Sequence, residues 1–191
     1  MSEFTVYGPI GFWHVLDVRA YDHLLFLLVL IVPFSIKEWK HWLFLVSLFT
    51  LGHTLSLILA VWGVIRINTS WVELLILCTI LVSALINLIH RGKNVDKKWM
   101  PWLLGITFFF GLIHGLGFSN FFTHLIPGRP SDKMWPLVHF ALGVEGGQLV
   151  VVFGSFLLSF LSETLFKFTK RDWILMMSSF VIGVVVCLLI N

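Results

Sequence analysis

Long runs of apolar side chains constrain this chain more than any other feature of its sequence. Charged residues or groups of glycine, proline and serine separate these runs, which cover most of the 191 residues. A helix needs about 20 predominantly apolar residues to cross a bilayer. The chain is 58% hydrophobic and only 12% charged, whereas soluble domains are about 45–50% apolar and about 25% charged. We therefore predict an all-α, polytopic membrane helix bundle that forms one domain over residues 1–191.

The apolar runs predict about six transmembrane helices. Their expected boundaries are Tyr21 to Phe34, Trp42 to Ile65, Trp71 to His90, Trp99 to about Phe118, Trp135 to Leu161 and Trp173 to Ile190. The first of these spans is short and the fifth is long. The segment from Gly8 to Val18 is too brief to cross a bilayer. We expect it to form a re-entrant or interfacial helix that leads into the first span.

Cationic residues predict the orientation of the bundle, because the cytoplasmic side of a membrane protein collects positive charge. Loops on one side carry Arg19, Arg66, Arg129 and Lys133. Loops on the other side carry Lys37, Lys40, Arg91, Lys93, Lys97, Lys98, Lys167, Lys170 and Arg171. We therefore expect both termini outside, in the cytoplasmic (inner) membrane of a bacterium. The net charge of +3 is scattered along the chain, which argues against nucleic acid as a partner, because such binding needs a concentrated basic face.

Ionisable side chains within the predicted spans point to a functional site, because they are costly in a bilayer unless they pair, contact water or bind a ligand. With the predicted orientation, they gather in the outer half of the membrane. We expect a metal site formed by His14, Asp17, Asp22, His23, His53, His114 and Glu145, with Glu73 and Gln148 orienting the ligands. His41 and His90 fall at the inner boundary, where we expect them to be interfacial.

Imidazole and carboxylate ligands suit zinc, nickel, iron or manganese. His14 and Asp17 are three residues apart, as are Glu145 and Gln148, so each pair shares one face of a helix. Both cysteines lie within apolar runs, which argues against copper(I) or an iron–sulfur cluster at this site. The residues therefore favour a divalent transition metal without fixing which one.

Several of these residues also have a purely structural interpretation. Asp22 stands where it could be the N-cap of the first span. Glu73 could be an acid at a helix start, stabilised by the helix dipole. His53 and His114 could be hydrogen-bonded core residues. Glu145 is the hardest to explain structurally, because a lone buried carboxylate needs a proton or a neighbouring cation.

Five motifs that contain the candidate ligands follow one another along the chain: Gly11-Phe12-Trp13-His14-Val15-Leu16-Asp17, Tyr21-Asp22-His23-Leu24-Leu25-Phe26, Phe49-Thr50-Leu51-Gly52-His53-Thr54, Phe110-Gly111-Leu112-Ile113-His114-Gly115-Leu116-Gly117-Phe118 and Gly143-Val144-Glu145-Gly146-Gly147-Gln148-Leu149. This ordered set resembles the HupE/UreJ family of hydrogenase and urease accessory membrane proteins. The likeness covers about residues 8 to 153 and is closest to the second branch, whose members lack a long lumenal domain. It implies a nickel or cobalt permease.

The chain departs from the family pattern at two places. Ala141 stands where the pattern has Asn ahead of the Gly-x-Glu motif, and the hydroxyl residues after His53 are swapped in order. The missing amide removes a ligand or an orienting group. Fine metal selectivity therefore does not follow from the resemblance.

Two functional hypotheses follow. The first is a metal-uptake protein or permease for nickel or cobalt. The second is an intramembrane metalloenzyme, a zinc-dependent hydrolase or a di-iron oxygenase, with a mono- or dinuclear centre. The number of ligands favours the second, because a conduction site must release its ion. A metal that only holds the helices together is a third interpretation.

The sequence gives little information about how the metal would be released inward or about the partners of the protein. Beyond Glu145, the fifth span offers only Ser155 and Ser159 as polar steps, so no inward release path is apparent. We expect contacts with membrane lipid and a metal ion. The sequence leaves open a homo-oligomer and a partner that delivers or receives the metal.

Overall fold

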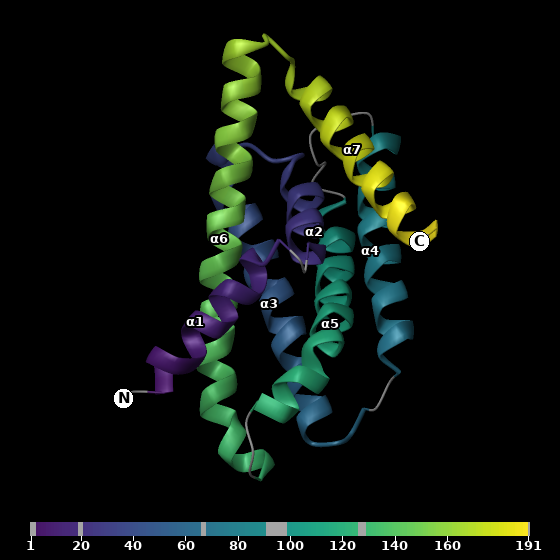
Figure 1. Ribbon diagram of the computed structural model, residues 1–191. Coiled ribbons are helices and arrows are strands. Elements are labelled where there is room, and N and C mark those ends of the chain that lie inside the picture. The colour runs from purple at the N-terminus through teal and green to yellow at the C-terminus, as the bar shows by residue number, and fades with distance from the viewer. Residues whose placement is uncertain (1–2, 19–20, 66–67, 91–98, 126–128, 191) are drawn as a thin grey trace.

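The computed structural model describes residues 3–18, 21–65, 68–90, 99–125 and 129–190. These residues form helices joined by short connections, and they contain no strand. The α-helices are α1 (Glu3–Leu16), α2 (Asp22–Ile31), α3 (Trp39–Val61), α4 (Thr69–Ile89), α5 (Met100–Leu125), α6 (Met134–Leu165) and α7 (Lys170–Ile190) (Figure 1). The 3₁₀ turns η1 (Ile36–Glu38) and η2 (Pro130–Lys133) lead into α3 and α6. The predicted all-α bundle is confirmed.

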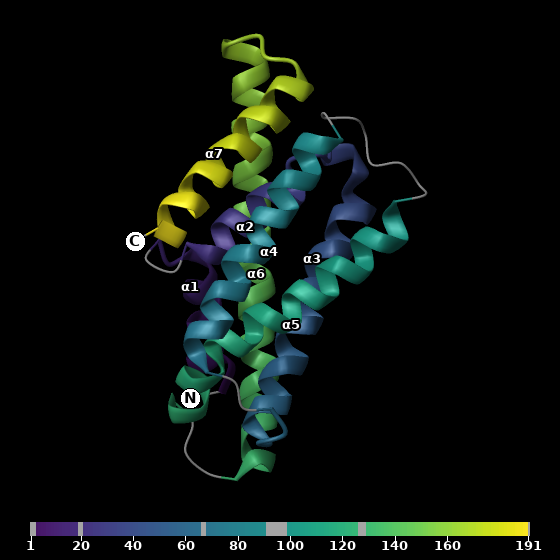
Figure 2. The ribbon, with the colours of Figure 1, turned by 90° about the vertical axis from the view of Figure 1, so that its right-hand side faces the viewer.

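Five helices, α3 to α7, are long and apolar enough to cross a membrane. The first predicted span differs, because α2 has only 10 residues and a bilayer needs about 20. Most of its side chains are buried, as expected of a core helix that is apolar on all sides. In Figures 1 and 2 it lies inside the bundle, while α7 leans against α4 at the side. The structure therefore has five long spans around a short central helix.

Pro33 sets the end of α2. The amide of Val32 still donates to Leu28 (3.0 Å), but Pro33 has no N–H to donate to the carbonyl of Val29. The Asn87 side chain of α4 supplies the missing donor, at 2.7 Å. In a bilayer such freed backbone groups are satisfied by neighbouring helices, so Asn87 ties the end of α2 to α4.

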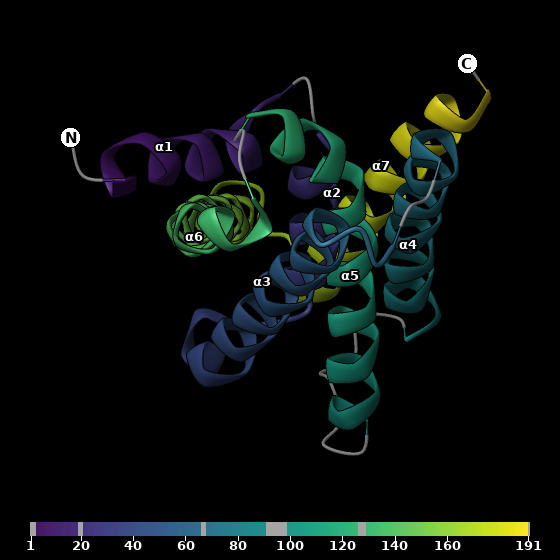
Figure 3. The ribbon, with the colours of Figure 1, turned by 90° about the horizontal axis from the view of Figure 1, so that it is seen from below.

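The expected N-terminal helix is present as α1, which begins five residues before the predicted Gly8. It crosses α6 obliquely (Figures 1 and 3). Glycines make this crossing close, since a Cβ atom at Gly11 would overlap the carbonyl oxygen of Phe140, and one at Gly143 would overlap that of Gly8. Because α1 ends near the bundle centre, where α2 begins, the two short helices form an interrupted segment.

The contact between α3 and α5 is close for the same reason. A Cβ atom at Gly52 would overlap the carbonyl oxygen of Phe108, and one at Gly111 would overlap that of Phe49. Small residues let membrane helices approach to backbone contact. This crossing holds the α3 and α5 segments that carry His53 and His114 against each other.

Two spans are longer than predicted. α5 continues to Leu125 instead of ending near Phe118, and α6 continues to Leu165. Ser119 and Thr123 look like helix-ending residues, but their hydroxyls donate to the carbonyls of Leu116 (2.7 Å) and Ser119 (2.8 Å) within α5. His114 is therefore near the middle of its helix and not near its outer end.

The orientation stays a prediction. Several of the cations that support it, Arg19, Arg66, Arg91, Lys93, Lys97 and Lys98, lie outside the described residues. The structure does, however, place the α3–α4 and α5–α6 connections at one end of the bundle and the α6–α7 connection at the other (Figure 1). The first end is the one predicted to face outward.

The glycine at the α3–α5 crossing gives a test of this packing. We expect Gly111→Ala to lower the thermal unfolding temperature of detergent-purified protein, because the added methyl must push apart two backbones. Gly105→Ala in the same helix is the matched control, since nothing lies within 4 Å of a Cβ there. It should be neutral or raise stability by up to about 1 kcal/mol through helix propensity. Equal stability of the two variants would contradict the proposed crossing.

Candidate metal centre

Four histidines from four different helices meet at the centre of the bundle. They are His14 of α1, His23 of α2, His53 of α3 and His114 of α5. The His23 ring lies 4.7 Å from that of His14, and 5.5 Å from those of His53 and His114, between ring centroids. His23, His53 and His114 are each only 1% exposed. The structure thus brings these four imidazoles together, as the sequence predicted.

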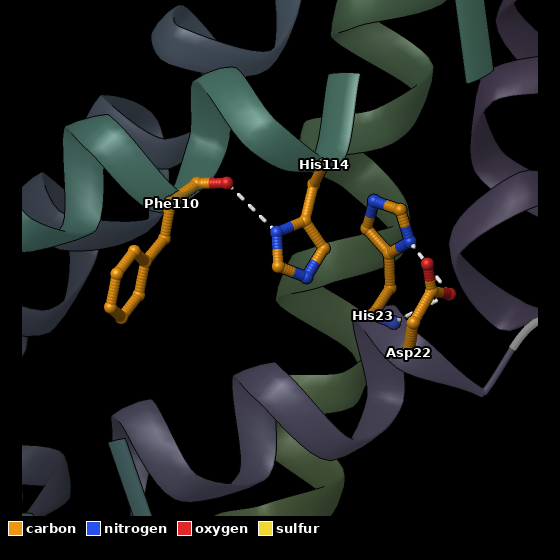
Figure 4. A network of polar contacts seen from close by, with 4 residues as sticks. All are labelled: Asp22, His23, Phe110 and His114. Atoms are coloured by element: carbon orange, nitrogen blue, oxygen red, sulfur yellow. Dashed lines mark hydrogen bonds and ion pairs between the residues drawn. The ribbon is translucent and has the colours of Figure 1, made fainter. Parts of the chain in front are cut away.

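Hydrogen bonds fix the orientation of two of these rings. Nδ1 of His114 donates to the carbonyl oxygen of Phe110 at 2.8 Å, and Nδ1 of His23 donates to the carboxylate of Asp22 at 3.2 Å (Figure 4). Because the protons are on Nδ1, each Nε2 presents a lone pair. Metal-binding histidines commonly have this arrangement, in which the second nitrogen donates to a carbonyl or carboxylate.

The free ring nitrogens converge. One ligand nitrogen from each of His14, His23 and His53 lies within 4.8 Å of the other two. Among the described residues, no hydrogen-bond partner exists for Nε2 of His14, His23 or His114, nor for either ring nitrogen of His53. Buried polar atoms are almost always satisfied, so this concentration of unpartnered nitrogens in an apolar bundle is suited to a cation. The donors fit a divalent transition metal.

Three carboxylates line the same cavity as His14, His23 and His114. The cavity has a volume of about 660 Å³ and is lined by Pro9, Ile10, Trp13, His14, Asp17, Asp22, His23, Glu73, Ile76, His114, Gly117, Phe118 and Phe121. Asp17 and Glu73 are exposed, and Asp22 is partly buried beside His23. The cavity thus runs from an exposed acidic rim to the buried imidazoles, and its remaining lining is mainly aromatic and aliphatic.

The structural interpretations of two acids are not supported. The N-cap of α2 is Tyr21, and Asp22 is the first helical residue. Its carboxylate accepts from the backbone N–H of His23 at 2.9 Å as well as from the ring. α4 begins at Thr69, so Glu73 lies beyond the first turn. Both acids are better explained by the cavity they line.

Glu145 and Gln148 belong neither to the histidine trio nor to the lining of the cavity. The hydroxyl of Ser47, on α3, donates to the carboxylate of Glu145, and the hydroxyl of Thr50 donates to Oε1 of Gln148 at 2.9 Å. Neither residue lines the cavity. The metal-ligand role of Glu145 and the orienting role of Gln148 therefore stay proposals, and their position between α3 and α6 separates them from the cavity.

Sequence reasoning missed the aromatic residues that enclose the imidazoles. The ring of Phe118 lies 3.9 Å from that of His14, and Phe49 lies 5.1 Å from His114, between centroids. A signal was present, because Phe49 precedes His53 by four residues and Phe118 follows His114 by four, which places each pair on one helix face. These rings exclude water and lower the local dielectric around the nitrogens.

Comparison with known proteins gives a match to a family. The family model described as "HupE / UreJ protein" matches residues 1–190. No curated protein and no solved structure matches the chain.

Removal of a single imidazole should weaken metal binding. We expect His53→Ala and His114→Ala each to lower the nickel affinity of purified protein by at least about tenfold, because even the loss of a group that only orients a ligand costs about 10–100-fold. His41→Ala and His90→Ala are controls, because His41 is exposed and Nδ1 of His90 bonds within its own helix to Ile86. Equilibrium dialysis measures the effect, and an equal loss in all four variants would contradict the assignment.

Proposed function

The chain belongs to the HupE/UreJ family, and on that premise we propose that it takes up a divalent transition metal, nickel or cobalt, through the histidine centre. The observation that carries the proposal is the set of buried, unpartnered imidazole nitrogens contributed by α1, α2, α3 and α5. Imidazole suits nickel, and late first-row metals bind such sites most tightly. The ion is the cargo of the protein and not a permanent part of it.

The cavity supports an approach from one side of the membrane. Glu73 is near the start of α4 and Phe121 is near the end of α5, so the rim lies toward the end of the bundle that we predict to face outward. Carboxylates at a cleft with low-dielectric walls raise the local concentration of cations. We infer that Asp17 and Glu73 attract the ion and that Asp22, held against His23, completes the path to the imidazoles.

The size of the cavity favours a second candidate. A water molecule occupies about 30 Å³ in the liquid, so an ion with six waters needs far less than the 660 Å³ available. A largely apolar cavity of this size matches those that hold organic ligands. The alternative is therefore an intramembrane metalloenzyme, a zinc-dependent hydrolase or a di-iron oxygenase. In that function, a cavity carboxylate would serve as the general base.

Transport gives the direct test. Protein reconstituted into liposomes that contain a metal-sensitive dye should show nickel or cobalt influx above that of empty vesicles, and His53→Ala should abolish it. If influx does not exceed the empty-vesicle rate for nickel, cobalt or zinc, permeation is lost as an explanation. Metal retained through repeated chelator washes would then favour the enzyme, whereas rapid loss of metal is expected of a transporter.

The acidic rim predicts a salt-dependent rate. Glu73→Gln should slow nickel influx at low ionic strength and have little effect at about 0.5 M salt, because screening shortens the range of an exposed charge. Glu163→Gln is the matched control, since Glu163 is an exposed carboxylate on α6 that does not line the cavity. A rate reduction by Glu73→Gln that is independent of salt would argue against electrostatic attraction.

A further inference from the structure

A second group of polar side chains lies beside the histidine centre, between α3 and α6, which run next to each other in Figures 1 and 3. This α3–α6 polar cluster consists of Ser47, Thr50, Glu145 and Gln148, joined by two hydrogen bonds across the helices. Gln148 is 0% exposed and Thr50 is 6% exposed. Such groups are costly within a bilayer and therefore require an explanation.

The charge of Glu145 has no cationic partner in the cluster. Within the described residues, no Lys, Arg or His forms an ion pair with it; its one hydrogen bond comes from the neutral hydroxyl of Ser47. Glu145 is partly buried within a membrane-spanning helix, where a carboxylate is costly unless it pairs, contacts water or binds a ligand. Its carboxylate is thus available to a positively charged ligand.

The amide of Gln148 is incompletely satisfied. Its Oε1 accepts from Thr50, while its Nε2 is buried without a partner among the described residues. Turning the amide over loses nothing, since Nε2 can donate to the Thr50 hydroxyl, whose proton can go to the carbonyl of Val46 at 3.3 Å. Oε1 then becomes a free acceptor, so the cluster offers amide, carboxylate and hydroxyl oxygens to a cation.

The α3–α6 polar cluster lies further along the predicted inward direction than His53 does. Thr50 precedes His53 by three residues on α3, an axial step of about 4.5 Å. Because α3 starts at the end of the bundle predicted to face inward, the cluster lies on the inward side of His53. Both ring nitrogens of His53 lack a hydrogen-bond partner among the described residues, so the ring has nitrogens available both to the histidine centre and to the cluster.

We propose that the α3–α6 polar cluster is a second, weaker divalent-cation site, which receives the ion from the histidine centre on its way inward. The role in passage rests on the proposed uptake function, whereas the site itself rests on Glu145 and Gln148. Oxygen ligands hold nickel and cobalt less tightly than imidazoles do. A weaker second site suits passage, because an ion must be able to leave each site that it occupies.

Nickel binding to purified protein tests the site without requiring transport. In equilibrium dialysis, wild-type protein should show a tight and a weak class of sites. Glu145→Gln keeps the size of the side chain and an acceptor for Ser47, and it should weaken the weak class by at least about tenfold while leaving the tight class unchanged. Glu163→Gln, on the same helix, should change neither class.

Gln148→Glu provides a test that misfolding cannot imitate. A second carboxylate beside Glu145 should strengthen the weak class severalfold, opposite to the effect of Glu145→Gln. His53→Ala should weaken the tight class and leave the weak class in place. A single class of sites in the wild-type protein, or a weak class that is the same in Glu145→Gln, would overturn the proposal.

Influx into proteoliposomes separates this inference from the proposed function. We expect Glu145→Gln to reduce nickel influx while nickel still binds at the histidines. If wild-type protein shows no influx but the weak class still depends on Glu145, the site stands and the uptake function falls. If influx is normal in Glu145→Gln, the ion does not pass through this cluster, and the proposed role in passage is overturned.

Discussion

The structure depends on one constraint: inside a bilayer, every polar group must find its partner within the protein. Backbone groups meet this requirement even where the chain is interrupted, as Asn87 shows when it donates to the carbonyl that Pro33 leaves free. Against that background, the concentration of imidazole nitrogens without hydrogen-bond partners in the described residues is the feature on which the proposed metal site rests. The same requirement for hydrogen-bond partners therefore explains how α2 ends and supports the proposed metal site.

Close helix crossings create the site. Glycines bring α1 onto α6 and α3 onto α5 until their backbones touch, and these crossings bring histidines that are far apart in the sequence to one point. The short α2 then fits into the centre with His23 at its start. A helix that crossed the whole bilayer could not begin at this depth. The interruption between α1 and α2 is thus what allows two of the candidate ligands, His14 and His23, to enter the middle of the bundle, as interrupted helices do in many transporters.

The depth of a residue along its predicted span was enough to identify the buried histidines. It was not enough where the neighbours of a side chain depend on the direction in which it leaves the helix. Composition predicted the helices, and burial of ionisable groups indicated His23, His53 and His114. Depth alone placed Glu145 with them, but only the packing of α6 against α3 shows that its carboxylate meets Ser47. The end of α5 was predicted too early for a different reason. Gly, Ser and Asn often end helices in water, whereas here the hydroxyls of Ser119 and Thr123 donate to carbonyls within α5 and the helix continues.

The division of the polar residues into two groups changes the balance between the functions considered. Gathered at one point, seven ligands would hold an ion or a pair of ions tightly, as an enzyme requires. The structure instead holds the imidazoles in one group and sets Glu145 and Gln148 in another, closer to the end of the bundle predicted to face inward. The second group offers one carboxylate, one amide and two hydroxyls, which hold a late transition metal less tightly than the four imidazoles do. The two proposed sites, about one helical turn apart along α3, would let an ion exchange one set of ligands for the next, which is the reason that we favour passage over retention.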